Sequence, residues 1–386
     1  MPSSSRWRVA GLFAGIGGIE VGLQRSGMHP ELLCERWAPA RAVLEHRFPD
    51  VPLDLDICGL SGLPPVELVT AGFPCTDLSQ AGYTKGITGA ASGLVGEVFR
   101  LLGDRRVPWV LLENVRNMLV LDGGRAMRFL IAELEALGYQ WAYRLVDSRF
   151  SGVPQRRQRV ILVASLDGDP REVLFPDDAG EPDVSHFRND VFGFYWTEGL
   201  RGLGWARDAV PTLKGGSTIG IPSPPAIWNP RGHVGHRLVT PTIVEAEQIQ
   251  GFRPGWTSAA DSVSNRKGTR WKLVGNAVTV GVAEWVADRL CHPKSFDAEV
   301  LRLRDGAPWP KAAYGTKGQR WSVGVSMWPT TEAYQHLGEL VDLRTAEPLS
   351  LRATSGFLER ARRGNLRMDD RFIDDVALHI AGVAAA

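Results

Sequence analysis

The stretch LFAGIGGIEVG, residues 12–22, places a glycine-rich turn between an apolar run and a segment with helical character. The run WRVAGLF predicts a β-strand, and the residues near Glu20 to Gln24 predict a helix. A turn rich in glycine lets the backbone approach a ligand closely, but it also serves where two elements simply pack tightly. The turn is formed by Gly15, Gly17 and Gly18. The stretch therefore predicts the opening strand, turn and helix of an α/β fold.

The same alternation of apolar runs and helical stretches continues to about Leu166. Further helices are predicted near Ala38 to His46 and near Gly124 to Leu137. Further strands are predicted at ELLCER, ELVTAGF, WVLLENV, YQWAYRLVD and RVILVAS. This rhythm is typical of βαβ units and predicts a doubly wound α/β, Rossmann-like domain with a mainly parallel sheet.

The composition changes after about Phe175, where Pro, Gly, Trp and Asp become frequent and helical periodicity fades. A second, smaller and irregular domain is expected there, followed by a helix in NAVTVGVAEWVADRL that returns to the first domain. The expected organisation is residues 1–175, 176–270, 271–291 and a C-terminal extension over 292–386.

The amino-acid composition excludes some classes of function but does not identify one. The 386 residues include 44 basic and 43 acidic ones, a net charge of +1, so any nucleic-acid surface must be local. No apolar run is long enough to span a bilayer and the opening MPSSSRWRVAG does not resemble a signal peptide, so a cytoplasmic location is expected. The four cysteines form no Cys-x-x-Cys pair, which disfavours zinc and a disulfide framework.

Several polar residues follow apolar strands, where ligands bind in open parallel sheets. Glu35 comes twenty residues after Gly15, a spacing at which a carboxylate can bind the hydroxyls of a ribose. Cys75 in AGFPCTDLSQAG and Glu113 in WVLLENV are each expected at the same sheet edge. An inert cysteine, a capping acid and, for QRRQR (155–159), a solvated basic turn are the structural alternatives.

Five short segments, FAGIGG, GFPC, ENV, QRRQR and GNAV, occur in this order along the chain. Together they resemble the ordered motifs of the cytosine carbon-5 DNA methyltransferases, bacterial or phage modification enzymes. The resemblance covers about Trp7 to Ser165 and His236 to Leu290. It implies an S-adenosylmethionine-dependent methyltransferase domain with a smaller target recognition domain.

The resemblance also implies a role for individual residues. The residues implied to bind S-adenosylmethionine are Phe13, Gly15, Gly17, Glu35, Trp37, Asp56, Ile57, Asn276 and Val278. The residues implied to be catalytic are Cys75, Glu113, Arg157 and Arg159. By this resemblance Cys75 attacks carbon 6 of cytosine, Glu113 contacts nitrogen 3 and the exocyclic amine, and no metal is required.

Double-stranded DNA is the implied partner, and its cytosine must be flipped out to reach Cys75. In the family the segment before GNAV reads the target, here from about Phe175 to His236, and the extension after His292 is expected to fold beside it. The candidates for base contacts are Lys214, Arg231, Arg266 and Lys267. A monomer is expected, with a cognate restriction enzyme or defence system as a partner that the family suggests.

Three other functions remain open at this stage. A tRNA cytosine-5 methyltransferase shares the same motifs, and labelled methyl transfer to tRNA or DNA would discriminate the two. A nicotinamide-dependent oxidoreductase could use the same glycine turn, although it would leave Cys75, Glu113 and QRRQR without a role. A catalytically silent DNA-binding protein would not need the complete motif set.

Overall fold

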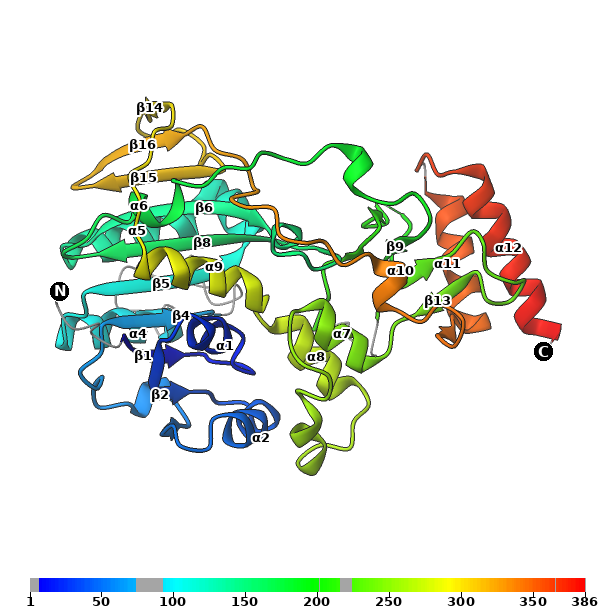
Figure 1. Ribbon diagram of the computed structural model, residues 1–386, viewed down its shortest axis with the longest axis horizontal. Helices are drawn as coiled ribbons and strands as arrows, with labels where there is room; N and C mark the ends of the chain where they lie inside the picture. Colours follow the sequence, from blue (N-terminus) through cyan, green and yellow to red (C-terminus); the bar gives the residue numbers. More distant parts are fainter. Residues whose placement is uncertain (1–6, 74–92, 201, 216–223, 365, 386) are drawn as a thin grey trace. The chain divides into compact units, whose positions relative to one another are not determined.

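The computed structural model describes residues 7–73, 93–200, 202–215, 224–364 and 366–385. The chain forms two compact units (Figure 1). Unit 1 comprises residues 1–151, 158–181 and 277–331. Unit 2 comprises residues 152–157, 182–276 and 332–386. These bounds differ from the four expected segments, because the C-terminal extension is divided between the units.

A ten-stranded sheet runs through the described part of unit 1 in the order β14-β16-β15-β6-β8-β5-β4-β1-β2-β3. Five strands are parallel neighbours: β1 (Arg8–Leu12), β2 (His29–Cys34), β3 (Leu53–Asp54), β4 (Leu68–Ala71) and β5 (Trp109–Val115). The others add antiparallel: β6 (Gln140–Asp147), β8 (Gln158–Ser165), β14 (Val300–Arg302), β15 (Ala312–Thr316) and β16 (Gln319–Val323). The α/β fold is thus confirmed.

The prediction of a mainly parallel sheet was wrong, because the sheet is mixed. Strands β6 and β8 are joined through residues 148–157, which contain only the short η4 (Ser148–Ser151) and β7 (Gln155–Arg156) and no long crossover helix. A parallel pair needs such a crossover, so neighbours with a short connection lie antiparallel. Strands β15 and β16 form a hairpin for the same reason, and its turn holds Lys317 and Gly318 at positive φ.

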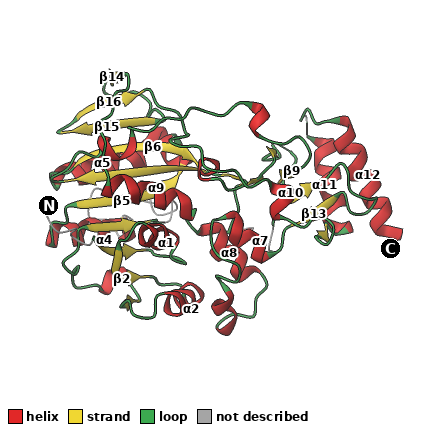
Figure 2. Cartoon of the chain, viewed as in Figure 1, coloured by secondary structure: helices red, strands yellow, loops and turns green. Residues whose placement is uncertain are grey.

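Helices cover both faces of this sheet, as Figures 1 and 2 show. On one face α1 and α9 cross so closely that a Cβ built on Gly22 would lie 2.6 Å from the Cβ of Ala283. On the other, α4 and α5 contribute to the main apolar core. The helices of unit 1 are α1 (Gly18–Arg25), α2 (Ala38–Arg47), α4 (Gly93–Asp104), α5 (Arg125–Ala136), α6 (Arg171–Leu174) and α9 (Val280–Cys291).

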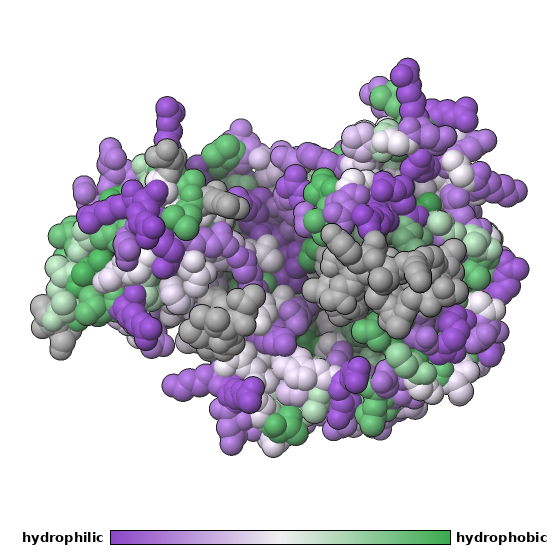
Figure 3. Space-filling view, turned by 180° about the vertical axis from the view of Figure 1, so that it is seen from behind, coloured by the Kyte–Doolittle hydropathy of each residue, from purple (hydrophilic) through white to green (hydrophobic). Residues whose placement is uncertain are grey.

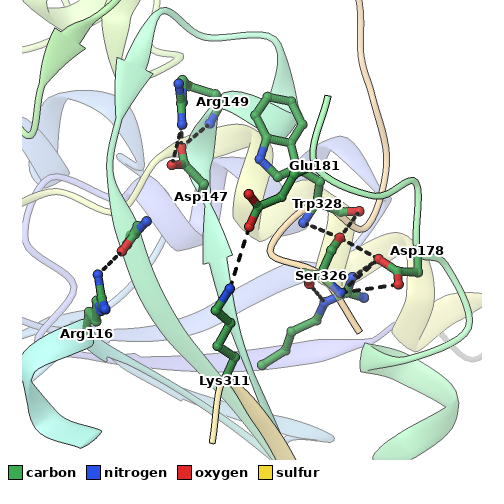
Figure 4. A network of polar contacts seen from close by, with 10 residues as sticks. Arg116, Asp147, Arg149, Asp178, Glu181, Lys311, Ser326 and Trp328 are labelled. Atoms are coloured by element: carbon green, nitrogen blue, oxygen red, sulfur yellow. Dashed lines mark hydrogen bonds and ion pairs between the residues drawn. The ribbon is translucent and has the colours of Figure 1, made fainter. Parts of the chain in front are cut away.

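Buried Arg144 of β6 joins the C-terminal strands to the rest of unit 1 through contacts with Ser326 and Asp178, which are both labelled in Figure 4. Its guanidinium donates to the carbonyl oxygens of Leu174, Asp177 and Ser326, and it pairs with the Asp178 carboxylate at 2.9 Å. Burial lowers the pKa of Arg144 to about 10. The Asp178 carboxylate in turn accepts from the Ser326 backbone amide at 3.1 Å. Residues 292–331 are therefore an integral part of this unit.

Unit 2 contains short antiparallel strands in the order β10-β9-β12-β13-β17 within its described residues. These strands are β9 (Phe192–Phe194), β10 (Ala206–Arg207), β12 (Ala226–Trp228), β13 (Leu238–Thr240) and β17 (Glu347–Pro348). A separate parallel pair joins β7 to β11 (Val210–Pro211). The helices are α7 (Ile243–Ile249), α8 (Gly268–Asn276), α10 (Leu337–Leu340), α11 (Leu351–Arg363) and α12 (Asp370–Ala385).

Asp208 fastens the C-terminal residues of unit 2 to the central segment 182–276. Its buried carboxylate accepts from the backbone amides of Arg188 and Leu337 at 3.0 and 2.9 Å and pairs with His336 at 2.5 Å. The backbone carbonyl of Asp208 accepts from the Tyr334 hydroxyl at 2.7 Å. The segment after residue 331 therefore folds together with the segment that precedes α8.

On the face drawn in Figure 3, hydrophilic residues predominate and apolar ones occur in scattered patches. Among the described residues, no helix has the length and apolar character needed to cross a bilayer.

Candidate active site

The predicted site residues of unit 1 follow one row of the sheet. Backbone pairing aligns Leu12, Cys34, Asp54, Ala71 and Leu112 across β1, β2, β3, β4 and β5. The residues one position further along these parallel strands include Phe13, Glu35, Gly72 and Glu113. Because parallel strands end at a common edge, the structure brings these four positions to the same edge of the sheet.

The glycine-rich turn after β1 has two functionally different glycines. Gly17 has φ +82° and lies against α2, where a Cβ would come within 2.5 Å of the Phe48 ring, so packing alone demands glycine there. Gly15 has φ +59°, yet a Cβ built on it meets nothing within 4 Å. Phe13, at φ +54°, holds a conformation that is uncommon for a residue with a side chain. The turn is therefore tight at Gly17 and open at Gly15.

Glu35 is held against this turn by backbone amides. Its two carboxylate oxygens accept from Gly15 N at 2.9 Å and from Trp37 N at 2.7 Å. Burial raises the pKa of the Glu35 carboxyl, and these amide donors oppose that rise. A carboxylate has about four acceptor sites, so Glu35 retains capacity beyond its backbone donors. The carboxylate can therefore accept hydrogen bonds from a ligand with hydroxyl groups beside Gly15.

Three further predicted residues follow β2 and β3. Trp37 is half-buried at the start of α2. Asp56 accepts from Cys58 N at 3.1 Å and so begins η1 (Ile57–Gly59), whose first residue, Ile57, is buried. These residues belong to the same strand ends as Glu35.

Cys75 lies outside the described residues, but the two residues that follow β4 do not. A Cβ built on Gly72 would lie 3.7 Å from Glu113 Oε2 and 3.8 Å from a methyl of Val278. Val278, from the GNAV motif, precedes α9 and belongs to unit 1. Glu113 and Val278 therefore flank the segment that leads to Cys75.

Glu113 is buried and forms an ion pair with Arg159 of β8, with Nε 2.9 Å from Oε1. The two side chains are 10% and 12% exposed, so water screens the pair only weakly. In the antiparallel pairing of β5 with β8, Glu113 lies opposite Ile161 and Val115 lies opposite Arg159. Glu113 and Arg159 are therefore on neighbouring strands. The Glu113 carboxylate at this edge of the sheet therefore has its charge balanced by the Arg159 guanidinium.

The remaining predicted residues, Arg157 and Asn276, belong to unit 2. Arg157 is buried, and its Nη1 donates to the carbonyl oxygens of Leu213 and Gly275 at 3.2 Å each. Asn276 ends α8, and its Oδ1 lies 2.4 Å from a Cβ built on Gly215. Arg157 thus links the β11 segment to the GNAV motif, whereas Arg159 contacts Glu113.

The three described cysteines lack the features of a reactive thiol. Burial raises the pKa of the Cys34 thiol to about 12. Desolvation also raises the pKa of Cys58 and of Cys291, and nearby carboxylates add to it. A nucleophile needs the thiolate, which these environments disfavour.

Of the candidates for base contacts, Lys214 forms an ion pair with Glu198 and lies 3.6 Å from the centre of the Tyr195 ring. Arg231, Arg266 and Lys267 are exposed in unit 2. Arg231, Arg266 and Lys267 therefore face solvent, whereas the Lys214 ammonium is already paired with a carboxylate.

Sequence reasoning gave no role to Asn114 or Glu20. Asn114, in ENV, donates from Nδ2 to the carbonyl oxygen of Phe73 at 3.1 Å. Glu20, on α1, is buried with its Oε1 accepting from the Thr70 hydroxyl at 3.3 Å. An acid inside an otherwise apolar helix stretch was the available hint for Glu20, while the Asn114 contact depends on the parallel register of β4 and β5.

Comparison with known proteins identifies relatives of this chain in sequence and in fold. Residues 7–191 match the family model of the C-5 cytosine-specific DNA methylases. Type II methyltransferase M2.BsuMI of Bacillus subtilis (strain 168) is 45% identical over 387 residues, spanning 96% of this chain and 97% of the relative. Type II methyltransferase M.BanI of Aneurinibacillus aneurinilyticus is 34% identical over 48% of this chain and 44% of its own length.

Among solved structures, the S. pombe Dnmt2 methyltransferase superposes with a TM-score of 0.55 at 17% identity, covering 74% of this chain and 98% of that one. This likeness concerns the fold, and it confirms the predicted Rossmann-like α/β architecture. The 45% identity to a Type II methyltransferase extends over both units. The chain therefore belongs to the family of C-5 cytosine-specific DNA methylases and is a DNA cytosine-5 methyltransferase.

Proposed function

We propose that this chain transfers the methyl group of S-adenosylmethionine to carbon 5 of a flipped cytosine in a specific duplex sequence, through a covalent adduct with Cys75. The observation that carries the proposal is the single row of Phe13, Glu35, Gly72 and Glu113 along adjoining strands. This row supports the proposal because the glycine-rich turn after β1 and Glu113 on β5 share one edge of the sheet, with the strand that leads to Cys75 between them. A methyltransferase needs its cofactor site and the acid that holds the base at the same edge of the sheet.

The cofactor turn suits S-adenosylmethionine in its chemistry. Open space beside Gly15 and the acceptor capacity of Glu35 match a ribose, which offers two hydroxyl donors. Trp37 would stack on the adenine, with Asp56 and Ile57 at its amino edge. Phe13, Gly17, Asn276 and Val278 would complete the site. When bound, this cofactor supplies an electrophilic methyl group.

Cys75 would act as the nucleophile. Its thiolate adds to carbon 6 of cytosine, and the electron pair of the carbon 5–carbon 6 bond makes carbon 5 nucleophilic. Carbon 5 would take the methyl group while the electron pair of the broken sulfur–methyl bond stays with S-adenosylhomocysteine as the leaving group. Loss of the carbon 5 proton to a base would then restore the double bond and expel Cys75 as a thiolate.

Glu113 would contact nitrogen 3 and the exocyclic amine of the same base. Protonation at nitrogen 3 would offset the negative charge that thiolate addition puts on the ring, and the ion pair with Arg159 fixes the carboxyl group of Glu113 in position. Arg157 would support the reaction by position, since it joins the carbonyl of Leu213, just after β11, to that of Gly275 in the GNAV motif. Preorganised charge of this kind requires no rearrangement during the reaction.

Unit 2 would recognise the target duplex, with Arg231, Arg266 and Lys267 among its exposed cations. The carbon-5 atom of a stacked cytosine is inaccessible, so contacts in this unit would offset the few kcal/mol that base flipping costs. Modification of host DNA alongside a cognate restriction enzyme, by a monomer, is the role that we infer.

Methyl transfer from labelled S-adenosylmethionine to unmethylated genomic DNA tests the proposal, with bisulfite sequencing to map the product. The wild type should label one sequence context, Cys75→Ser should abolish labelling, and Cys58→Ser should retain it as the matched control. Label on tRNA in place of DNA would contradict the proposal. Unchanged activity of Cys75→Ser would refute the covalent step.

A further inference from the structure

A cavity of about 370 Å³ lies in unit 2, where β9, β10 and β12 meet the start of α12. Its volume is within the range of about 300–1,000 Å³ that is typical of small-ligand sites. It is lined by Asn189, Phe192, Leu203, Trp205, Trp228, Arg367, Met368, Asp369 and Phe372. No residue proposed above for methyl transfer belongs to this set, so the cavity is a separate feature of the molecule.

Four aromatic rings form its apolar wall. Phe192 is nearly parallel to Trp205, with ring centres 5.1 Å apart, and lies 5.2 Å from Trp228. Phe372 meets both tryptophans edge-on at 5.0 and 5.2 Å. Trp228 and Phe372 are buried, whereas Phe192 and Trp205 are half-buried. The wall therefore keeps two aromatic rings accessible on a rigid base.

The buried part of this wall is fixed by polar contacts. Trp228 donates from its indole nitrogen to Asp375 at 2.9 Å, and Asp375 also pairs with Arg237. Both β12, which carries Trp228, and α12, which carries Phe372, belong to one apolar cluster. Rings held in this way offer contact area with little loss of conformational entropy on binding.

Three polar side chains stand at the exposed side of the cavity. Asn189, Arg367 and Asp369 are exposed residues, and the Asp369 carboxylate accepts from Arg371 N at 2.9 Å with one oxygen. An amide, a guanidinium and a carboxylate can together pair with the donors and acceptors along the edge of a base, or with the phosphate beside it. The cavity thus combines stacking surfaces with edge-reading groups.

We propose that this cavity binds a nucleobase of the DNA substrate that has left the helical stack, at a position other than the target cytosine. Aromatic faces bind unstacked bases of any sequence, and polar groups at the base edge then select among them. Arg367 balances the charge of Asp369, so the rim offers no net negative charge to an organic cation, the other ligand class that aromatic walls attract. The inference rests on the proposed DNA substrate, but not on the chemistry of methyl transfer.

Photochemical cross-linking of the full chain tests this assignment. The probe is a short duplex with a single bulged 5-iodouracil, and the matched duplex carries the same 5-iodouracil paired with adenine. Peptide mapping by mass spectrometry should locate an adduct on Phe192 or Trp205 with the bulged probe and none there with the paired one. Adducts confined to unit 1 would overturn the proposal, because the unstacked base would then enter the methylation site instead.

Binding measurements with the same duplexes give a second criterion. Trp205→Leu should reduce the preference for the bulged duplex about 10-fold, and Trp205→Phe should preserve it, because only the phenyl ring restores stacking. Arg367→Ala should also reduce it, whereas Arg352→Ala, an exposed arginine of α11 in the same unit, should not. An undiminished preference in both Trp205→Leu and Arg367→Ala would overturn the proposal.

These readouts require no methyl transfer, so they separate the two proposals. An adduct in the cavity without methylation of any DNA would retain this site and reject the proposed reaction. Methylation that depends on Cys75, with no adduct in the cavity, would support the proposed reaction and reject the proposed base-binding cavity. Circular dichroism melting of each variant verifies that the chain is folded.

Discussion

The side-chain amide of Asn114 donates from Nδ2 to the carbonyl oxygen of Phe73 at 3.1 Å, while its Oδ1 accepts from Val115 N at 2.8 Å. Phe73 stands two residues before Cys75, and Asn114 directly follows Glu113. One side chain thus connects the backbone leading to the proposed nucleophile with the strand that carries the proposed base-holding acid.

Replacing Asn114 by alanine should therefore impair catalysis more than substrate binding. The Phe73 carbonyl would lose its donor, at a cost of about 1–3 kcal/mol in stability. A displacement of about 1 Å in the reacting groups lowers rates by about 100-fold. Single-turnover methyl transfer and thermal melting would measure both effects. Asn117→Ala, an exposed residue of η2 (Arg116–Leu119), is the control, and equal losses in the two variants would contradict the positioning role.

The ion pair between Glu113 and Arg159 should show strong energetic coupling. Removing one partner of a buried pair leaves the other charge uncompensated, which costs about 3–5 kcal/mol. Glu113→Gln and Arg159→Ala should each destabilise unit 1, and the double variant should lose less than the sum. Denaturant unfolding of the four proteins gives this cycle. Additive losses in the free energy of unfolding would mean that the two side chains are not coupled. Arg116→Ala, which removes an exposed arginine on the nearby surface, is the charge control.

Glu35→Gln should weaken cofactor binding without unfolding the chain. Glutamine retains the shape but only one acceptor oxygen, so it cannot serve Gly15 N, Trp37 N and two ribose hydroxyls together. Calorimetric titration with S-adenosylhomocysteine should show at least about a 10-fold loss of affinity, since charge-assisted hydrogen bonds contribute about 1.5–3 kcal/mol each. Glu31→Gln, exposed on the same strand β2, should bind normally.

Glu20 should make stability depend on pH near neutrality. Burial raises its pKa from 4.5 to about 7, and the charge of Glu35 acts in the same direction. Because the folded state holds this proton more tightly than the unfolded state, stability should decrease as pH rises from about 4.5 to about 7 and then level off. A rise of this size corresponds to about 3 kcal/mol.

Glu20→Gln removes that ionisation and tests the effect directly. The variant should melt at a higher temperature than the wild type at pH 8 and at a similar temperature at pH 4.5. Glu45→Gln, an exposed acid of α2, should change neither value. Parallel pH profiles for the wild type and Glu20→Gln would show that another group controls the titration.

The first half of the fold could be predicted because its information is local. Strands β1, β2, β4, β5, β6 and β8 each coincide with a stretch that the sequence predicts to be a strand from its apolar residues. The row of site positions then follows from parallel pairing. The helix α4 (Gly93–Asp104) was not predicted, although its apolar face contributes to the main core.

Unit 2 could not be predicted in the same way, because its strands have only two or three residues and take their partners from distant segments. Strand β17, for example, pairs Pro348 with Val239 across more than a hundred residues. The QRRQR motif shows the same limit at the level of side chains. Its β7 and β8 portions belong to different units, so Arg157 and Arg159 have unrelated partners despite being two residues apart.

The contacts of Asp208 with Leu337 and His336 restrict how enzymes of this kind can change their target preference by recombination. If unit 2 selects the target, a recombination event that exchanged only residues 182–276 between two relatives would set a foreign loop against the native Leu337 and His336. In such hybrids the buried carboxylate at position 208 would not match its partners after residue 331, and the chain would fold poorly. New target preferences in this lineage should therefore arise by gradual substitution, or by a double crossover event that transplants residues 332–386 as well.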